Sequence, residues 1–309
     1  MARSIIIDCD PGVDDAIALL LAIAHPTELE ILGITTVAGN VPLHYTSQNA
    51  LKICALAKTD IPVYAGCPRP MIQPLSTATN VHGATGLQGT ELPESKRPLM
   101  VQHAVAFLIE TLQQASEPIT LVTLGPLTNI AVALIQAPQV ANKIDTIIAM
   151  GGAVTHGNMT PAAEFNIYVD PHAAKVVFES GIPIKLITLD TTHQVLTTSA
   201  HLNAFKQLNT SVGTAAADLL TYYGTSDVKR YGMPGAPLHD PCVIAYLLKP
   251  ELFTFRPTYT AIDTTSPQNL GRTVIDWWGH TAKLPNAEIA EFVDAPGIYE
   301  LLIKSLAKL

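Results

Sequence analysis

Charge is scarce in this chain of 309 residues. Only 14% of the residues are Asp, Glu, Lys or Arg, and Lys and Arg together number 18, which leaves a formal net charge of -8. Nucleic acids and anionic membrane surfaces are bound through clustered Lys and Arg side chains. We therefore expect neither as the main partner, and a small neutral ligand is favoured instead.

Long apolar runs and paired cysteines are also missing. The longest apolar run, AIALLLAIA at 16–24, is about half of the ~20 residues that span a bilayer. The amino terminus, MARSIIIDCD, has too short an apolar part for a secretory signal. No CxxC pair occurs, so neither a zinc knuckle nor a redox dithiol is indicated, and we expect a cytoplasmic protein with reduced thiols. The cysteines are Cys9, Cys54, Cys67 and Cys242.

Against this background, the stretch IIIDCDPGVDD at 5–15 is unusual. It places Asp8, Asp10, Asp14 and Asp15 around a Pro-Gly turn. Carboxylates that close repel one another and resist burial, so a cation, protons or many donors must compensate them. Asp14 and Asp15 alone can be explained as caps of a helix that starts near Val13. The whole cluster favours a hard divalent cation, Ca²⁺ or Mg²⁺, although the pattern is not that of an EF-hand.

Apolar runs typical of strands alternate with helical spacing through the first two thirds of the chain, which predicts an α/β fold. Continuous apolar strands between helices are typical of a parallel sheet covered on both faces. The predicted strands are 4–8, 29–37, 62–65, 119–124, 145–150 and 183–189. The predicted helices between them are 13–24, 42–57, 101–114, 127–136 and 171–179.

The last third differs. Helical stretches near 198–223 and 238–248 precede three alternating runs, TYTAIDT, RTVIDWW and AEIAEFV, and a closing helix from Gly297. This predicts a small β-meander added to the main sheet. No linker or repeat divides the chain, so we expect one domain over residues 1–309.

Polar groups follow several of the predicted strands. Open parallel sheets bind ligands beyond the carboxyl ends of their strands. Asp8 and Asp10 follow the first strand, AGN to Asn40 follows the second, LGPLTN begins at Leu124, and MGGAVTHGN begins at Met150. These groups are therefore expected to converge on one region.

Three further segments carry candidate site residues. His82 lies in NVHGATGL, and His239 and Asp240 lie in APLHDP, where Asp240 is either a helix cap or a ligand. The segment GNMTPAAEFNIYVDP supplies side chains suited to binding hydroxyl groups, namely Asn158, Glu164 and Asn166. Neither these segments nor the first aspartate cluster contains Lys or Arg, and no GxxxxGK[ST] or GxGxxG sequence occurs. The ligand is expected to be uncharged and rich in hydroxyls.

These residues carry a family resemblance. DCDPGVDD, NVHGATGL, LGPLTNIA, MGGAVTHGNMTPAAEFNIYVDP and PLHDPC occur in the order found in inosine-uridine preferring nucleoside hydrolases, and the chain resembles that family over nearly its whole length. The resemblance implies hydrolysis of the N-glycosidic bond of ribonucleosides, releasing ribose and a free base, in nucleoside salvage. It also implies a homodimer or homotetramer.

The resemblance also implies roles for individual residues. Ca²⁺ would be held by Asp10, Asp15, Asp240 and the main-chain carbonyl of Leu124, where the family commonly has Thr. Asp10 would be the general base, and Asp14 and Asn40 would hold the ribose hydroxyls. Asn158, Glu164 and Asn166 would hold the 5′ side of the ribose.

The leaving base requires a proton. His239, helped by His82, is the expected acid, because imidazole titrates near neutral pH. Tyr223 and Tyr231, around the segment GTSDVKRYGMPG that we expect to close over the site, would stack on either a purine or a pyrimidine, so inosine and uridine are both expected substrates. A pyrimidine-specific enzyme is the alternative.

Two alternatives of other classes remain. A haloacid-dehalogenase-like phosphatase also has a strand followed by DxD and binds magnesium, but such an enzyme needs a Lys near the phosphate. A non-catalytic protein that binds calcium and a sugar would use the same carboxylates without turnover. His82 and His239 favour chemistry over binding alone.

Overall fold

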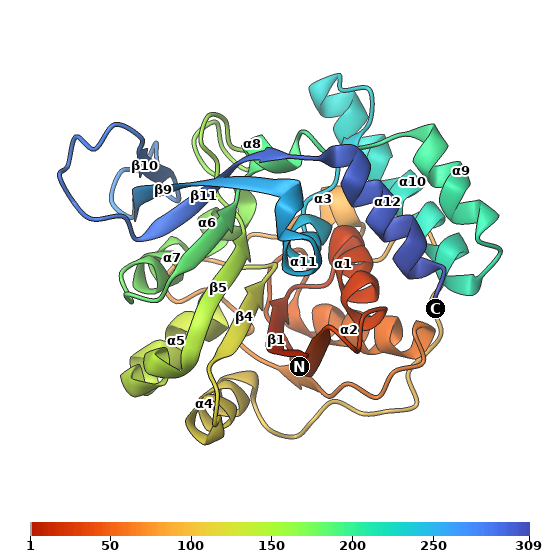
Figure 1. The fold of residues 1–309 in the computed structure, drawn as a ribbon, viewed down its shortest axis with the longest axis horizontal. Helices are drawn as coiled ribbons and strands as arrows, with labels where there is room; N and C mark the ends of the chain where they lie inside the picture. Colours follow the sequence, from red (N-terminus) through yellow and green to blue (C-terminus); the bar gives the residue numbers. More distant parts are fainter. Residues whose placement is uncertain (1) are drawn as a thin grey trace.

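The computed structural model describes residues 2–309, apart from the side chains of residues 226–231. Its parallel strands are β1 (Arg3–Cys9), β2 (Leu29–Thr36), β3 (Val63–Ala65), β4 (Ile119–Thr123), β5 (Ile144–Met150) and β6 (Ile184–Ile187). Three further strands are β9 (Phe253–Ile262), β10 (Thr273–Asp276) and β11 (Ala287–Val293). Together they form a sheet in the order β10-β9-β11-β6-β5-β4-β1-β2-β3 (Figure 1). The predicted α/β fold with a mostly parallel sheet is confirmed.

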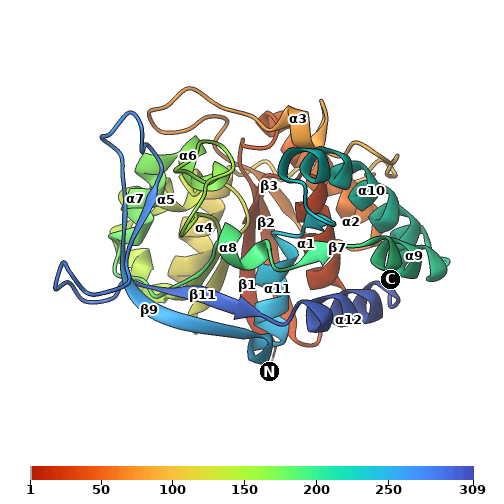
Figure 2. The ribbon, with the colours of Figure 1, turned by 90° about the horizontal axis from the view of Figure 1, so that it is seen from above.

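Helices cover both faces of this sheet. Successive side chains of a strand point to opposite faces, so the apolar strands present buried side chains to helices on each side. Ile5 and Ile7 of β1 belong to one buried cluster, and Ile6 belongs to the other. The first cluster includes residues of α1 (Val13–Ile23), α2 (Leu43–Leu56), α10 (Ser211–Tyr231), α11 (Pro241–Leu248) and α12 (Ala295–Leu306). The second includes residues of α4 (Ala104–Gln114), α5 (Thr128–Gln136) and α7 (Pro171–Phe178). Figure 2 shows the two groups of helices on opposite sides.

The carboxyl-terminal strands continue the main sheet. β11 pairs in parallel with β6 and antiparallel with β9, and β9 pairs antiparallel with β10. The expected antiparallel strands are therefore present. Their order differs from a meander, since β9 rather than β10 occupies the middle. Alternation within each run predicted the strands, but it contains no information about which strands become neighbours.

The predicted helix near 198–223 is divided in two. The helix is interrupted between α9 (Ser199–Gln207) and α10, where Asn209 has a φ of 53°. α10 then continues to Tyr231, so residues 224–231, expected to form a closing segment, are the last turns of a helix. The remaining short elements are α3 (Thr79–His82), η1 (Pro138–Lys143), α6 (Phe165–Val169), α8 (Leu189–Thr192), β7 (Leu196–Thr197), β8 (Ala236–Pro237) and η2 (Pro250–Leu252).

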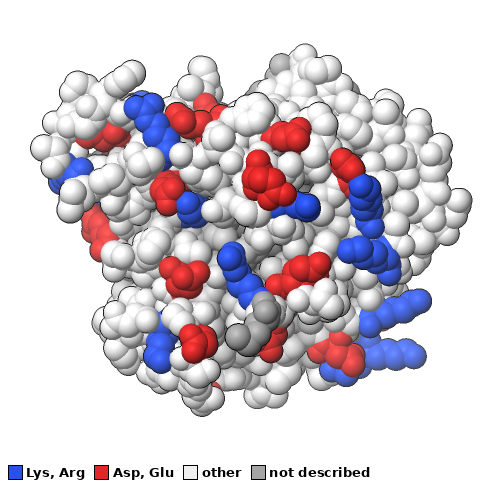
Figure 3. All heavy atoms as spheres, viewed as in Figure 1, with Lys and Arg blue, Asp and Glu red and all other residues white. Residues whose placement is uncertain are grey.

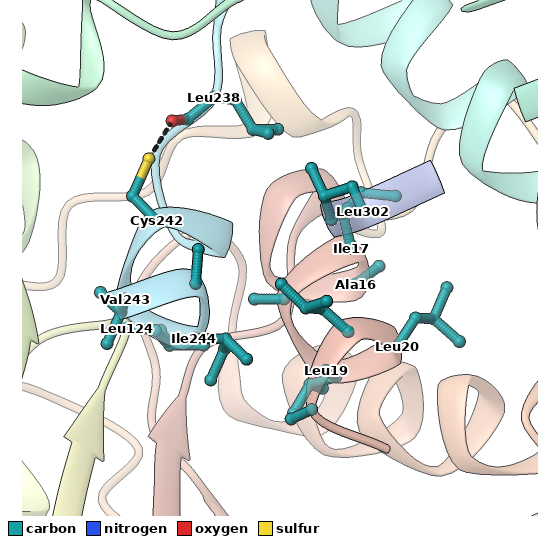
Figure 4. Packing of buried hydrophobic residues seen from close by; sticks show 14 of the residues in the cluster. Ala16, Ile17, Leu19, Leu20, Leu124, Leu238, Cys242, Val243, Ile244 and Leu302 are labelled. Carbon is teal, nitrogen blue, oxygen red and sulfur yellow. Dashed lines mark hydrogen bonds between the residues drawn. The ribbon is translucent and has the colours of Figure 1, made fainter. Parts of the chain in front are cut away.

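The packing of α1 against α11 brings distant parts of the sequence together. Figure 4 shows Ile17 of α1 beside Leu302 of α12, and Val243 and Ile244 of α11 beside the chain at Leu124. These apolar side chains are almost fully buried, and burial of each contributes about 1.5–3 kcal/mol. Asp14 and Asp15 lie in the first turn of α1, and Asp240 immediately precedes α11. The core thereby places the late aspartate beside the early ones.

On the face of the molecule shown in Figure 3, basic side chains lie beside acidic ones. The ion pairs among the described residues include Lys185 with Glu288 at 2.7 Å and Lys304 with Glu300. Among the helices of the described part of the chain, none has the length and apolar character needed to cross a membrane.

Candidate active site

One open pocket is lined by most of the side chains expected at the site. The expected site residues that line it are Asp14, Asn40, His82, Leu124, Asn158, Glu164, Asn166, Tyr223, His239 and Asp240. Asp10 and Asp15 are completely buried and do not line the pocket. The side chain of Tyr231 lies outside the described residues.

Three carboxylates gather where α1 and α11 begin. One carboxylate oxygen from each of Asp14, Asp15 and Asp240 lies within 4.8 Å of the other two, and all three residues are buried. Asp15 also serves as a cap, because its Oδ2 accepts the backbone N–H of Gly12 at 2.9 Å. Asp240 occupies the N-cap position of α11 but makes no side-chain cap hydrogen bond. Capping therefore explains part of the role of Asp15, but it does not explain why the side chain of Asp240 is buried here.

Asp10 is held beside this trio by close backbone packing. Its Oδ2 accepts the backbone N–H of Asn40 at 2.7 Å, and its buried Oδ1 has no hydrogen-bond partner among the described residues. A Cβ added to Gly39 would lie 2.0 Å from Oδ2, and one added to Gly125 would lie 2.3 Å from Oδ1. The two glycines thus leave the space that the carboxylate occupies. Both glycines lie in motifs that follow predicted strands, AGN and LGPLTN, but the sequence did not indicate this role for them.

The acidic cluster lacks enough positive charge. Burial, followed by repulsion from Asp15, raises the pKa of Asp10 well above its ordinary value. Burial and the charge of Asp14 do the same to the pKa of Asp240, and burial raises the pKa of Asp15 to about 6. A hard divalent cation removes both penalties by supplying charge and accepting oxygen ligands. The donor set therefore fits such an ion.

The carbonyl of Leu124 belongs to the same region. Its oxygen accepts a hydrogen bond from Asn166 Nδ2 at 2.8 Å, and a carbonyl oxygen has a second lone pair for a further contact. Because this donor is part of the main chain, Leu in place of the family's common Thr leaves it available.

His82 and His239 lie on one pocket wall but are neutral. His82 Nδ1 accepts the backbone N–H of Val13 at 3.1 Å, so the neutral ring carries its proton on Nε2. Burial lowers the pKa of both His82 and His239 to about 3. The expectation based on the titration range of free imidazole does not hold for these buried rings. The assignment of His239 as the acid stays a prediction.

Asn158, Glu164 and Asn166 already hold the wall of the pocket together. Glu164 caps α6 by accepting the N–H groups of Asn166 at 2.8 Å and Ile167 at 3.2 Å, and it accepts the N–H of Gly152 at 2.8 Å. Asn158 Oδ1 accepts the N–H of Phe165 at 2.9 Å. Burial raises the pKa of Glu164 to about 7. These contacts shape the binding wall, and direct contact with a ribose stays a prediction.

Tyr223 completes the wall on the α10 side. Its ring centroid lies 5.5 Å from that of His82 and 6.4 Å from that of His239. Sequence reasoning missed several pocket residues altogether. His193, whose ring lies 5.8 Å from His239, is one of them. Its signal was available, because LDTTH begins at the carboxyl end of the predicted strand 183–189. The other missed lining residues include Thr77, Asn80, Met159 and Phe165.

Comparisons with known proteins agree with this fold. The model of the family described as inosine-uridine preferring nucleoside hydrolase matches residues 5–300. The pyrimidine-specific ribonucleoside hydrolase RihA of Salmonella typhimurium is 44% identical over 308 residues, covering 99% of each chain. An uncharacterized protein of Schizosaccharomyces pombe is 48% identical over 309 residues, again covering 99% of each chain.

Solved structures show the same likeness. The purine-preferring ribonucleoside hydrolase from Gardnerella vaginalis superposes with a TM-score of 0.92 at 33% identity, covering 99% of this chain and 98% of its own. A plant nucleoside hydrolase superposes with a TM-score of 0.93 at 33% identity, covering 99% of each. The fold and site define an N-glycosyl hydrolase acting on ribonucleosides, and the chain belongs to the inosine-uridine preferring nucleoside hydrolase family.

Proposed function

We propose that this protein is a Ca²⁺-dependent ribonucleoside hydrolase that accepts both uridine and inosine. The observation that carries the proposal is the buried Asp10 Oδ1, which has no hydrogen-bond partner among the described residues and lies beside the trio of Asp14, Asp15 and Asp240. Asp10, Asp15, Asp240 and the carbonyl of Leu124 would hold the ion. When bound, the ion lowers the pKa of a coordinated water and offers coordination positions to vicinal hydroxyls.

The side chains of the chain then perform the displacement at C1′. Asp10 takes a proton from the attacking water through Oδ1, the carboxylate oxygen with no other partner among the described residues. Asp14 and Asn40, which line the pocket, bind the ribose hydroxyls. Water oxygen bonds to C1′ as the bond from C1′ to the base nitrogen breaks, and nearby carboxylates stabilise the oxocarbenium-like charge.

The leaving base faces the side of the pocket formed by His82 and His239. Its nitrogen gains the electron pair of the broken bond, and donors on the wall relieve that charge. His82 has an Nε2–H for this purpose, because its Nδ1 is occupied by the N–H of Val13. His239 is the proposed proton donor, with Tyr223 packing beside both rings.

Acceptance of both purine and pyrimidine bases rests on stacking of the base on the ring of Tyr223. An aromatic face stacks on purines and pyrimidines alike, and relatives of both kinds of named preference resemble this chain. Pyrimidine specificity is the second candidate, favoured by the 44% identity to RihA. Specificity constants for uridine and inosine decide between them. A ratio beyond about a thousandfold, on the order of 4 kcal/mol, contradicts dual acceptance.

A reducing-sugar assay on uridine and inosine, with and without chelator, tests the function itself. Release of ribose that stops with chelator and returns with Ca²⁺ is the expected result. Release of phosphate from p-nitrophenyl phosphate without ribose release would instead support a phosphatase, although none of the described side chains that line the pocket is Lys or Arg. Calcium binding without release of ribose would support the non-catalytic alternative.

A further inference from the structure

Among the described side chains, one polar contact holds the ring of His239, and it comes from the end of α8. Thr192 Oγ1 lies 2.7 Å from His239 Nδ1, and Thr192 is completely buried. The ring also packs against His193 at 5.8 Å and against the edge-on Tyr223 at 6.4 Å, measured between ring centroids. Aromatic packing at these distances limits the position of a ring but does not select which ring nitrogen faces a ligand.

The contact with Thr192 makes that selection. The two nitrogens of an imidazole point in diverging directions, so a ring whose Nδ1 meets Thr192 presents Nε2 on its other side. Within the part of the chain whose side chains are described, Nε2 has no hydrogen-bond partner. Since His239 lines the pocket, Nε2 is the ring nitrogen available to a bound base.

Thr192 is suited to hold the ring whatever protons it carries. A hydroxyl both donates and accepts, and it rotates to suit its partner. Its own proton has a second acceptor, the backbone oxygen of Leu189 at 3.3 Å, one turn earlier. Thr192 can therefore donate to a bare Nδ1, or accept from Nδ1–H while donating to Leu189. The hydrogen bond between Thr192 and the ring therefore does not depend on the charge of the imidazole.

We infer that Thr192 is a positioning residue for the leaving-group step, acting through His239 by fixing its Nε2 toward the departing base. The inference rests on the proposed function and adds a residue to it. Orienting contacts of this kind support catalytic imidazoles by holding the ring in one rotamer. Any hydrogen bond or proton that His239 gives to the base passes through Nε2.

Two substitutions at one position separate orientation from packing. Thr192→Val replaces the hydroxyl by a methyl group of similar volume, and Thr192→Ser retains the hydroxyl. Each variant is assayed on uridine and inosine and on p-nitrophenyl β-ribofuranoside, whose phenolate departs without a proton. The measured quantity is the ratio of kcat on a nucleoside to kcat on the phenyl riboside, which is independent of the fraction of enzyme that is folded.

For Thr192→Val we expect this ratio to fall by about 10- to 100-fold, part of the 10²–10⁴-fold typical of general acid catalysis, with KM for the nucleoside changed less than about threefold. Thr192→Ser should keep the ratio close to that of the unmodified enzyme. Equal losses on both substrates, or equal behaviour of the two variants, would overturn the inference. Failure of the unmodified enzyme to cleave any nucleoside would instead overturn the proposed function.

If Thr192→Val yields no folded protein, ¹⁵N NMR of the unmodified enzyme provides the second test. The Nδ1 signal of His239 should show a hydrogen-bonded nitrogen, and the Nε2 signal should be the one that shifts when a ribonucleoside analogue binds. A shift confined to Nδ1 would contradict the inference.

Discussion

Asn49 joins the aspartate turn to the loop that follows His82. Its Nδ2 donates to the carbonyl of Pro11 at 2.9 Å and to the carbonyl of Thr85 at 2.7 Å. The next residue, Gly86, has a φ of +93°, and a Cβ there would lie 2.6 Å from the same Nδ2. One buried amide of α2 therefore sets the spacing between the carboxylates and the wall that carries His82.

Asn49→Ala should weaken catalysis as well as the fold. Loss of the amide leaves two carbonyls without that donor, which costs about 1–3 kcal/mol of unfolding free energy. A shift of about 1 Å between reacting groups strongly lowers the reaction rate, so kcat/KM on uridine should fall about tenfold or more. Urea denaturation and steady-state kinetics measure the two effects.

Asn286→Ala is the matched control. Asn286 Nδ2 also bridges two carbonyls, those of Phe178 and Thr260, each at 2.9 Å, and the residue does not line the pocket. It should lose comparable stability with kcat/KM unchanged. If the two variants lose activity equally, Asn49 has no special role at the site.

Gly125→Ala should abolish most of the activity. The added Cβ would approach Asp10 Oδ1 to 2.3 Å, a distance that forces the buried carboxylate to move. We expect a decrease in kcat of about 100-fold or more on both base classes, because a general base must lie within hydrogen-bond reach of its proton.

Gly224→Ala provides the comparison for that substitution. Its Cβ would lie 3.7 Å from the nearest heavy atom, in Ala236, and Ala is favoured over Gly within a helix by about 0.5–1 kcal/mol. This variant should be slightly more stable and fully active. Full activity of Gly125→Ala would show that Asp10 tolerates displacement.

The sequence predicted the parts of the site whose cause is local. An apolar run followed by a polar cluster places Asp10, Asn40 and Leu124 at the carboxyl ends of neighbouring strands, because every parallel strand ends at the same edge. The arrival of Asp240 beside Asp15 could be suspected from its HDP motif. Its cause, the packing of α1 against α11, becomes visible only in the structure.

The parts that escaped prediction depend on contacts between distant segments. The low pKa of His82 follows from its burial, which a loop rich in glycine does not reveal. The contact between Thr192 and His239 joins residues 47 positions apart. Likewise, the position of β9 between β10 and β11 follows from pairing of β11 with β6, which local alternation cannot specify.

The stability of the protein should depend on pH through Glu164. Burial raises its pKa from 4.5 to about 7. Between these values the folded state keeps a proton that the unfolded chain has released, so the contribution of Glu164 is fully present below about pH 4.5 and is lost as the pH rises through 7. The change amounts to roughly 3–4 kcal/mol at most.

Urea denaturation between pH 4.5 and 8 at constant Ca²⁺ measures this contribution as a difference between two proteins. Glu164→Gln cannot ionise, so its unfolding free energy should decline less steeply across that window, even though the variant starts lower because its amide group faces backbone N–H donors. Parallel curves for the two proteins would show that Glu164 stays ionised in the fold.

Removal of the metal should expose the repulsion within the acidic cluster. Asp240→Asn replaces a carboxyl group that costs free energy to bury as a charge or to protonate, and it removes no capping hydrogen bond. Without an ion the variant should therefore be more stable than the unmodified protein, by on the order of 1 kcal/mol or more. In Ca²⁺ the order should reverse, because the unmodified protein gains binding energy that the variant lacks. Thermal unfolding in chelator and in Ca²⁺ measures both. Asp145→Asn, at an exposed carboxylate, should behave like the unmodified protein in each condition. A variant at Asp240 that keeps the full response to Ca²⁺ would exclude this carboxylate as a ligand.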